Sequence, residues 1–140
     1  MKPDLFASVL ELTNGVCQSS LPAIIRQTEG YIPSTLTYET QCGSPSSPWV
    51  IEVEPGRKIN ITLHDYTKGQ VTDGSSFPGV CYAYAIIKEE GRHEVQTICG
   101  GRKRVRHVYT SLSNRVEISI MNGGGEQQRQ QYFLLHYKGR

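Results

Sequence analysis

Apolar and polar side chains alternate along residues 48–65. Large apolar residues occupy every second position from Trp49, and the same spacing resumes at Ile59 after the Pro55-Gly56 pair. Successive side chains of a strand point to opposite faces of a sheet, so each half of this stretch predicts a half-buried strand. Proline presets its own backbone and glycine accepts positive φ, which favours a tight turn between the two halves. We therefore expect an antiparallel hairpin as the seed of a sheet, with Trp49 on its buried face.

Short strands separated by turn residues are expected along the second half of the chain. The sequence predicts them at 81–88, 94–99, 105–110, 115–121 and 132–137. Both faces of the first are apolar, which is typical of a central strand, and we expect Tyr82 and Tyr84 to pack in the core. Because helical periodicity is scarce, the series predicts the all-β class, as an antiparallel sandwich or barrel.

The beginning of the chain gives weaker signals. Leu5, Val9 and Leu12 have helical spacing, so residues 1–16 are expected to form a short helix or a frayed end. Residues 18–30 predict one short strand, and residues 29–34 predict a turn that leads to a sheet edge.

Length and composition are those of one soluble globular domain. The chain has 140 residues, of which 37% are hydrophobic and 20% are charged. Its 15 lysines and arginines against 13 acidic residues leave a net charge of +2, too small to indicate a nucleic-acid partner. No apolar run approaches the roughly 20 residues that cross a bilayer, so this segment is not expected to insert into a membrane. The first residues lack the apolar core of a signal peptide.

The chain has four cysteines, Cys17, Cys42, Cys81 and Cys99. None forms a C-x-x-C pair, which argues against a zinc knuckle or a thioredoxin-type site. An even number of well-spaced cysteines is typical of disulfides formed in an oxidising compartment. The sequence allows three pairings, of which two sequential loops are the simplest, and the alternative is four buried free thiols in a cytosolic protein.

The cysteine frame and the ordered strand sequences together resemble a CUB domain. The resembling parts are Cys17; Cys42 with Trp49-Val50-Ile51-Glu52-Val53 and Pro55-Gly56; Ile59-Asn60-Ile61-Thr62-Leu63-His64-Asp65-Tyr66; Cys81 with Tyr82-Ala83-Tyr84; Cys99-Gly100; Ser113-Asn114-Arg115-Val116; and Tyr132-Phe133-Leu134-Leu135-His136-Tyr137. The resemblance covers residues 17–138 and leaves 1–16 as an N-terminal extension. It implies a jelly-roll sandwich of two antiparallel sheets with disulfides Cys17–Cys42 and Cys81–Cys99. It also implies an extracellular module that binds another protein or a glycan.

Calcium is not expected, although many CUB domains bind it through acidic residues. The family has an aspartate soon after the third cysteine, where this chain has Tyr82-Ala83-Tyr84, and Asn122 occupies the late loop where a second aspartate is usual. Calcium takes six to eight oxygen ligands and favours carboxylates, and only Asp65 and Asp73 remain nearby in the sequence. We expect no metal and no other cofactor.

Two surface features are candidate sites. Asn60-Ile61-Thr62 is a glycosylation sequon, and alternation puts Asn60 on the outward face of its strand. Arg102, Lys103, Arg104 and Arg106, with His107, form the one cluster of positive charge. This cluster is expected either to bind a sulfated glycan or an acidic partner, or to be a solvated strand edge that discourages aggregation. No aromatic residues interleave with it as nucleic-acid binding would favour.

No catalytic residues are expected. His64, His93, His107 and His136 lack the spacing of a metal motif, and no local signature supports a cysteine–histidine pair. The leading hypothesis is a non-catalytic extracellular interaction domain of a larger secreted or membrane-anchored protein. The alternatives are an accessory domain of a secreted protease and a stand-alone heparin- or glycan-binding protein of the spermadhesin kind.

Overall fold

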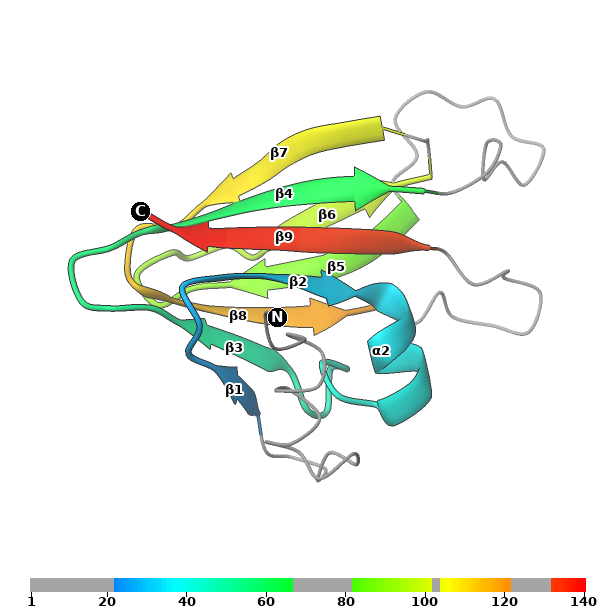
Figure 1. Ribbon diagram of the computed structural model, residues 1–140, viewed down its shortest axis with the longest axis horizontal. Coiled ribbons are helices and arrows are strands. Elements are labelled where there is room, and N and C mark those ends of the chain that lie inside the picture. The colour runs from blue at the N-terminus through cyan, green and yellow to red at the C-terminus, as the bar shows by residue number, and fades with distance from the viewer. Residues whose placement is uncertain (1–21, 67–81, 102–103, 122–131) are drawn as a thin grey trace, which may run out of the picture.

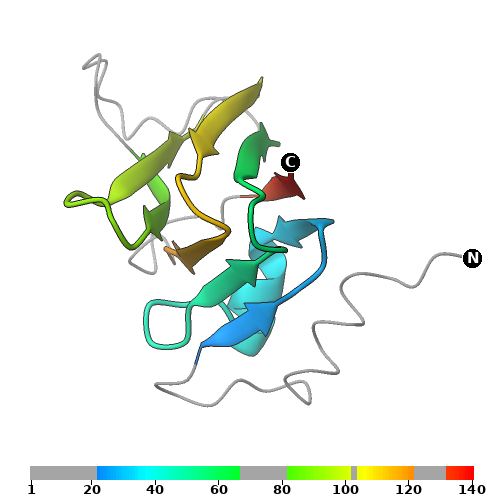
Figure 2. The same cartoon turned by 90° about the vertical axis from the view of Figure 1, so that its left-hand side faces the viewer.

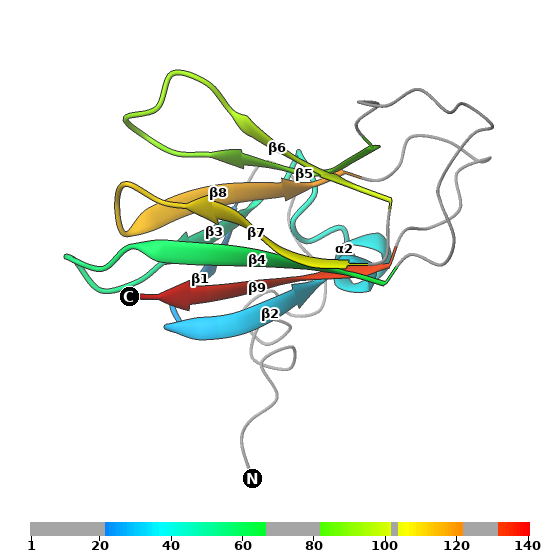
Figure 3. The same cartoon turned by 90° about the horizontal axis from the view of Figure 1, so that it is seen from above.

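Two β-sheets pack face to face (Figure 1). The structure, a computed structural model, describes residues 22–66, 82–101, 104–121 and 132–140. The five-stranded sheet has the order β1 (Ala23–Ile25), β3 (Trp49–Glu52), β8 (Arg115–Ile120), β5 (Tyr82–Lys88) and β6 (Gln96–Gly100). The four-stranded sheet has the order β2 (Glu29–Pro33), β9 (Phe133–Gly139), β4 (Ile59–Asp65) and β7 (Arg104–Thr110). Figure 3 shows the two layers from above, with the single described helix, α2 (Ser34–Thr40), near one end.

The predicted all-β sandwich is confirmed. The five strands expected in the second half of the chain correspond to β5, β6, β7, β8 and β9, with small shifts at their ends. The expected central strand lies between β8 and β6, inside the larger sheet. All described pairs are antiparallel except β1 and β3, which run parallel.

The predicted hairpin over residues 48–65 is wrong, although both of its strands exist. β3 belongs to the five-stranded sheet and β4 to the four-stranded sheet, so the Pro55-Gly56 segment carries the chain from one layer to the other. Hydrogen bonds fix the two ends of this connection to different partners: Val53 N–H donates to Asn114, and Lys58 exchanges two bonds with Arg140. Two successive strands with apolar faces can bury these faces either as neighbours in one sheet or as members of two facing sheets. Alternation alone therefore could not choose between these arrangements.

The turn predicted at residues 29–34 is also wrong. Residues 29–33 form edge strand β2, with Ile32 buried and Tyr31 exposed, and Ser34 begins α2. This helix has seven residues, includes three threonines of low helix propensity, and has no side-chain N-cap bond. The sequence therefore offered no helical signal there, and the burial of Leu36 and Thr37 supports the helix instead.

The core lies between the inward faces of the sheets. Its largest fully buried side chains are Trp49, Tyr84, Tyr137, Ile32, Ile51, Ile59, Ile61, Leu63, Ile87, Ile98, Ile118 and Ile120. A β-bulge in β5 changes the expected alternation, because the pairing with β6 skips Tyr84. Tyr84 and Ala85 are consequently both buried, and the Tyr84 ring stacks on Phe133 of the other sheet with centroids 4.3 Å apart.

Candidate functional site

The outer face of the four-stranded sheet collects side chains from four distant parts of the sequence. The register forms one row of Glu29, Lys138, Asn60 and Thr110, a second of Tyr31, His136, Thr62 and His107, and a third of Pro33, Leu134, His64 and Val105. In β4 and β9 the side chains between these positions are buried, so the alternation predicted for β4 is confirmed.

Three rings gather near the middle of this face. The centroid of Tyr31 lies 4.8 Å from that of His136 and 6.2 Å from that of His64. The two histidine rings are 6.4 Å apart and nearly perpendicular. Nε2 of His136 lies 2.7 Å from Oε2 of Glu29, which ties β9 to the outer edge of β2. The cluster is therefore a set of ordered aromatic side chains held by sheet pairing.

Two further tyrosines extend this cluster at the end of the sheet. Tyr66 follows β4 and Tyr132 precedes β9, and the Tyr66 N–H donates to the Tyr132 carbonyl over 2.9 Å. Of the six exposed large hydrophobic residues in the described part of the chain, four belong to this face: Tyr31, Tyr66, Val105 and Tyr132. We call the surface formed by Tyr31, His64, Tyr66, Val105, Tyr132, Leu134 and His136 the tyrosine face. Sequence reasoning missed it, because only the register between β2, β9, β4 and β7 brings these residues together.

The sequon asparagine lies on the same sheet face, at the other end of β4. Asn60 is half-buried, and its Oδ1 accepts a hydrogen bond from Thr110 Oγ1 over 2.9 Å. Thr110 Oγ1 is in turn 2.8 Å from Nε2 of His107. Since the threonine hydroxyl donates to Asn60, it accepts from His107. Neither bond involves the amide nitrogen of Asn60.

The predicted basic cluster divides in the structure. Arg102 and Lys103 lie outside the described residues, and Arg104 is exposed on edge strand β7. Arg106 is half-buried and donates from Nη2 to the Cys99 carbonyl over 2.8 Å, joining β7 to the edge of β6. Burial lowers the pKa of Arg106, the Arg104 charge lowers it further, and Asp65 opposes both effects. Arg106 is therefore a contact between the sheets, and whether the cluster binds a ligand stays a prediction.

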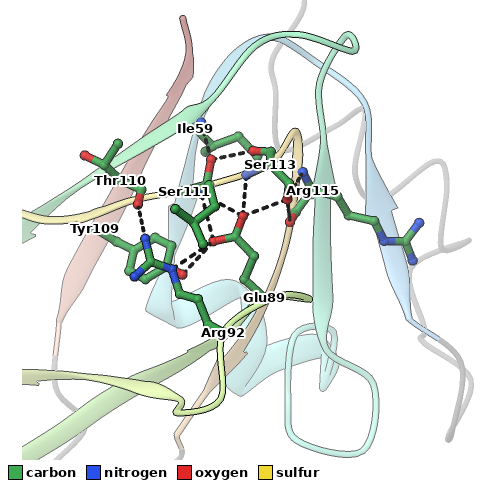
Figure 4. Close-up of polar contacts among 9 residues, drawn as sticks. Ile59, Glu89, Arg92, Tyr109, Thr110, Ser111, Ser113 and Arg115 are labelled. Carbon is green, nitrogen blue, oxygen red and sulfur yellow. Dashed lines mark hydrogen bonds and ion pairs between the residues drawn. The ribbon is translucent and has the colours of Figure 1, made fainter.

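A buried carboxylate, Glu89, joins two connections at one end of the sandwich (Figure 4). Figure 2 faces that end, where the β3–β4, β5–β6 and β7–β8 connections lie. Glu89 accepts bonds from Tyr109 Oη (2.7 Å), from the Leu112 N–H (2.8 Å), and from the N–H and hydroxyl of Ser113 (both 2.6 Å). Arg92 Nε lies 3.4 Å from the same carboxylate. We call this set the Glu89 hub.

The pKa values in the hub follow from these contacts. Burial raises the pKa of Glu89, but the bonds from Ser113, Tyr109 and Leu112 outweigh it, and the pKa falls below its usual value. Burial, with the bond to Glu89 and its charge, raises the pKa of Tyr109 to about 12. Both groups are thereby held in the forms that make their shared hydrogen bond.

A second buried carboxylate, Asp65, lies between the two sheets. It accepts from the Tyr84 hydroxyl and from the Gly101 N–H, each over 2.9 Å. These donors come from β5 and from the residue after β6, so Asp65 connects the end of β4 to the opposite layer. Sequence reasoning considered Asp65 only as a remaining calcium ligand.

No protein-family model matches the chain, and no curated protein matches it. The extracellular region of zebrafish Gpr126/Adgrg6 is similar in structure, with a TM-score of 0.50 and 16% identity over 87% of this chain and 15% of that chain. The two-sheet sandwich that the resemblance to a CUB domain implies is confirmed. The CUB1-EGF-CUB2 domain of human MASP-1/3 has a TM-score of 0.48 and 21% identity, over 84% of this chain and 41% of that one.

At 16% identity the likeness to the Gpr126/Adgrg6 region is one of fold alone. The chain spans less than half the length of either solved chain. Within the described ranges, the sandwich has no group of three or more histidine, cysteine or acidic side chains arranged to hold a metal ion. Asp73 and Asn122, named above in connection with calcium, lie outside those ranges. No described helix has the length and apolar character needed to cross a membrane.

The four cysteines of the chain are only partly described. Cys42 is buried and Cys99 is half-buried, and neither is a free thiol. Cys17 and Cys81 lie outside the described residues, so the two predicted disulfides stay predictions.

Proposed function

We propose that this chain is a non-catalytic extracellular interaction domain, a jelly-roll sandwich of the CUB kind closed by two disulfides, within a larger secreted or membrane-anchored protein. The observation that carries the proposal is the tyrosine face. Soluble domains rarely expose a contiguous apolar patch without using it for binding, and tyrosine is enriched where proteins meet.

The buried carboxylates support a role without catalysis. A general acid or base must be able to reach a substrate, and in an enzyme it is usually found in a cleft. Glu89 and Asp65 instead accept hydrogen bonds from backbone and side-chain donors that join loops or sheets. Both groups therefore act as structural acceptors in this proposal.

The sheet register supports the sequential disulfides. Gly43, beside Cys42, accepts a bond from Ile120, which pairs with Ala85, and Ala85 pairs with Ile98 beside Cys99. Three strand spacings of about 4.8 Å place these cysteines about 14 Å apart, whereas a disulfide joins Cα atoms within about 7 Å. This argues against a Cys42–Cys99 bond.

The sequential pairing is then our proposal for the other cysteines. It joins Cys81 to Cys99 and Cys17 to Cys42, and both Cys17 and Cys81 lie outside the described residues.

Secretion followed by disulfide mapping tests the proposal. The chain, made with an export signal in animal cells, is expected to carry Cys17–Cys42 and Cys81–Cys99 when its peptides are separated without reduction. The same chain made in a reducing cytosol should unfold at a lower temperature, because it lacks the cross-links that restrict the unfolded state. Four free thiols in the folded, secreted protein would contradict the extracellular assignment.

Asn60 is expected to carry a glycan when the chain is secreted. The bond from Thr110 engages the amide oxygen and not the amide nitrogen, the atom that a glycan modifies. Electrophoresis should show a slower band that returns to the unmodified position after treatment with an amidase specific for N-linked glycans. The variants Asn60→Gln and Thr62→Ala should lack the slower band, and an unchanged pattern in both would refute modification at this residue.

The alternatives named above gain less support. Heparin binding through the basic cluster loses one of its four cations, because Arg106 donates to the Cys99 carbonyl. An accessory domain of a secreted protease would have the same sandwich fold next to a catalytic domain. No contact among the described residues favours this alternative.

A further inference from the structure

We propose that the tyrosine face binds a protein segment that presents an apolar side chain next to a carboxylate. The inference rests on the proposed function and adds the class of partner and the surface that binds it. Of the basic cluster predicted from the sequence, Arg104 and Arg106 lie on β7, the edge strand of the same sheet.

The composition of the face favours a protein over a sulfated glycan. No lysine or acidic residue belongs to the tyrosine face, while Glu29 and Lys138 lie in the neighbouring row of the same sheet face. An apolar, aromatic centre with charges at its rim is the pattern of protein interfaces. Sulfate groups are recognised mainly by lysine and arginine, which this centre lacks.

Charge complementarity indicates a partner with a carboxylate. His64 and His136 lie in the centre and His107 at the β7 side, whereas Glu29 is the one carboxylate among the three described rows. Glu29 is already 2.7 Å from His136. A carboxylate from a partner would therefore find donors on this face and little repulsion.

The size of the sheet argues against a second copy of this chain as the occupant. Four strands about 4.8 Å apart, with about 23 Å of length in β4, give a face on the order of 400 Å². Stable interfaces bury about 800 Å² on each partner. A short segment of a partner fits this area, and its binding is expected to be of moderate affinity.

The sequon restricts where that segment lies. Asn60 and Tyr66 are six positions apart on or just beyond β4, which corresponds to about 20 Å of extended chain. A glycan on Asn60 would cover the end of the face that carries Lys138 and Thr110. The segment is then expected to lie between Tyr31, near the middle of the face, and Tyr66 and Tyr132 at the opposite end.

Peptide selection tests the inference with the 140-residue secreted chain. Random 12-residue peptides displayed on phage are selected on the wild-type chain after removal of those that bind the Tyr66→Ser, Tyr132→Ser double variant. The selected sequences are expected to share an apolar residue beside an aspartate or glutamate. Affinity for the synthetic form of the strongest binder is expected to fall at least tenfold in the double variant, because tyrosines at interface centres are frequent hot spots.

A second variant and a matched control keep the test independent of folding. Val105→Asp places a carboxylate on an exposed edge-strand position and is expected to weaken binding at least tenfold by repulsion. Val95→Ser and Leu112→Ser remove the other two exposed hydrophobic residues of the described part, and should leave binding unchanged. Thermal unfolding of every variant is measured alongside.

The pH dependence gives an independent readout of charge. Histidine is the side chain whose charge changes near neutral pH, so the peptide should bind more tightly at about pH 5.5 than at about pH 7.5. The charged and titratable groups around His64 and His136 are Tyr31 and Glu29 from β2, Lys138 from β9, and His107 and Arg104 from β7. Replacing the peptide carboxylate by its amide should remove this dependence.

Several results would overturn the inference. The inference is refuted if the selected peptides lack an acidic residue, or if no peptide is selected at all. It is also refuted if the double variant binds the peptide as tightly as the wild type, or if heparin is the only ligand whose binding the double variant loses. If sedimentation shows that the wild-type chain is a dimer and that Val105→Asp is a monomer, the face binds a second copy of this chain and the inference is overturned. If the predicted disulfides form but no peptide binds the tyrosine face, this inference is refuted and the proposed function stands. Free thiols in the secreted protein would instead contradict the proposed function.

Discussion

Glu89→Ala is expected to lower the free energy of unfolding by about 4 kcal/mol, since removing one partner of a buried, charged hydrogen-bond network costs about 3–5 kcal/mol. The N–H groups of Leu112 and Ser113 would lose their acceptor, as would the buried Tyr109 hydroxyl. Water can reach these donors only if the β7–β8 connection moves. Chemical denaturation of the wild type and the variant measures the difference.

Glu89→Gln separates the charge from the shape. The amide fills the same space but presents an N–H₂ group to donors that need an acceptor, so a loss of about 2–3 kcal/mol is expected. Glu90 is the matched control, because it is the next residue, is exposed, and makes none of the hub contacts. Glu90→Gln should change stability by less than about 0.5 kcal/mol. Equal effects at the two positions would show that the hub contributes nothing specific.

The contribution of Glu89 to stability should also depend on pH. The folded-state pKa of Glu89 is lowered, so its contribution is complete above the unfolded-state value and disappears as the pH falls through the folded-state value. The difference in stability between wild type and Glu89→Gln should therefore narrow below about pH 4, where the unfolded carboxyl binds its proton. A difference that stays constant from neutral to acid pH would assign the effect to packing.

The sequence predicted this fold wherever the signal was local. Alternation located β4 and β8, and two apolar faces indicated that β5 is central. The Glu89 hub and the tyrosine face were not predictable in the same way. Glu89 lies between two predicted strands, and the backbone N–H groups that it accepts from, those of Leu112 and Ser113, lie more than twenty positions later in the chain, on a connection that packing brings alongside.

The hairpin error has the same origin. The residues on either side of Pro55-Gly56 have the correct period, and the period decides which side chains are buried. It does not decide which strand is the neighbour. That choice depends on the residues that flank β8 and β9, because Asn114 bonds to Val53 and Arg140 bonds to Lys58 at the two ends of the connection.

Gly43→Ala is expected to be the most damaging single-methyl change in the described part of the chain. Gly43 has φ +85°, and a Cβ there would overlap the indole of Trp49, which is fully buried. The left-handed backbone costs a residue with a side chain about 1–2 kcal/mol, and overpacking a rigid site adds about 1–3 kcal/mol. We expect a loss of at least 3 kcal/mol, measured by denaturant unfolding and by a change in Trp49 fluorescence.

Two other glycines separate these causes. Gly56 has φ +91° with nothing within 4 Å of an added Cβ, so Gly56→Ala measures the backbone cost alone, about 1 kcal/mol. A Cβ at Gly100 would overlap the ring of Tyr84 without a left-handed backbone, so Gly100→Ala measures the overlap alone, about 2 kcal/mol. If Gly43→Ala costs no more than Gly56→Ala, the Trp49 ring moves freely and the packing around it is looser than its burial indicates. A cost near the sum of the other two would mean that this end of β3 is held rigidly against the Gly43 backbone, whose carbonyl also accepts the Ile120 N–H over 2.6 Å.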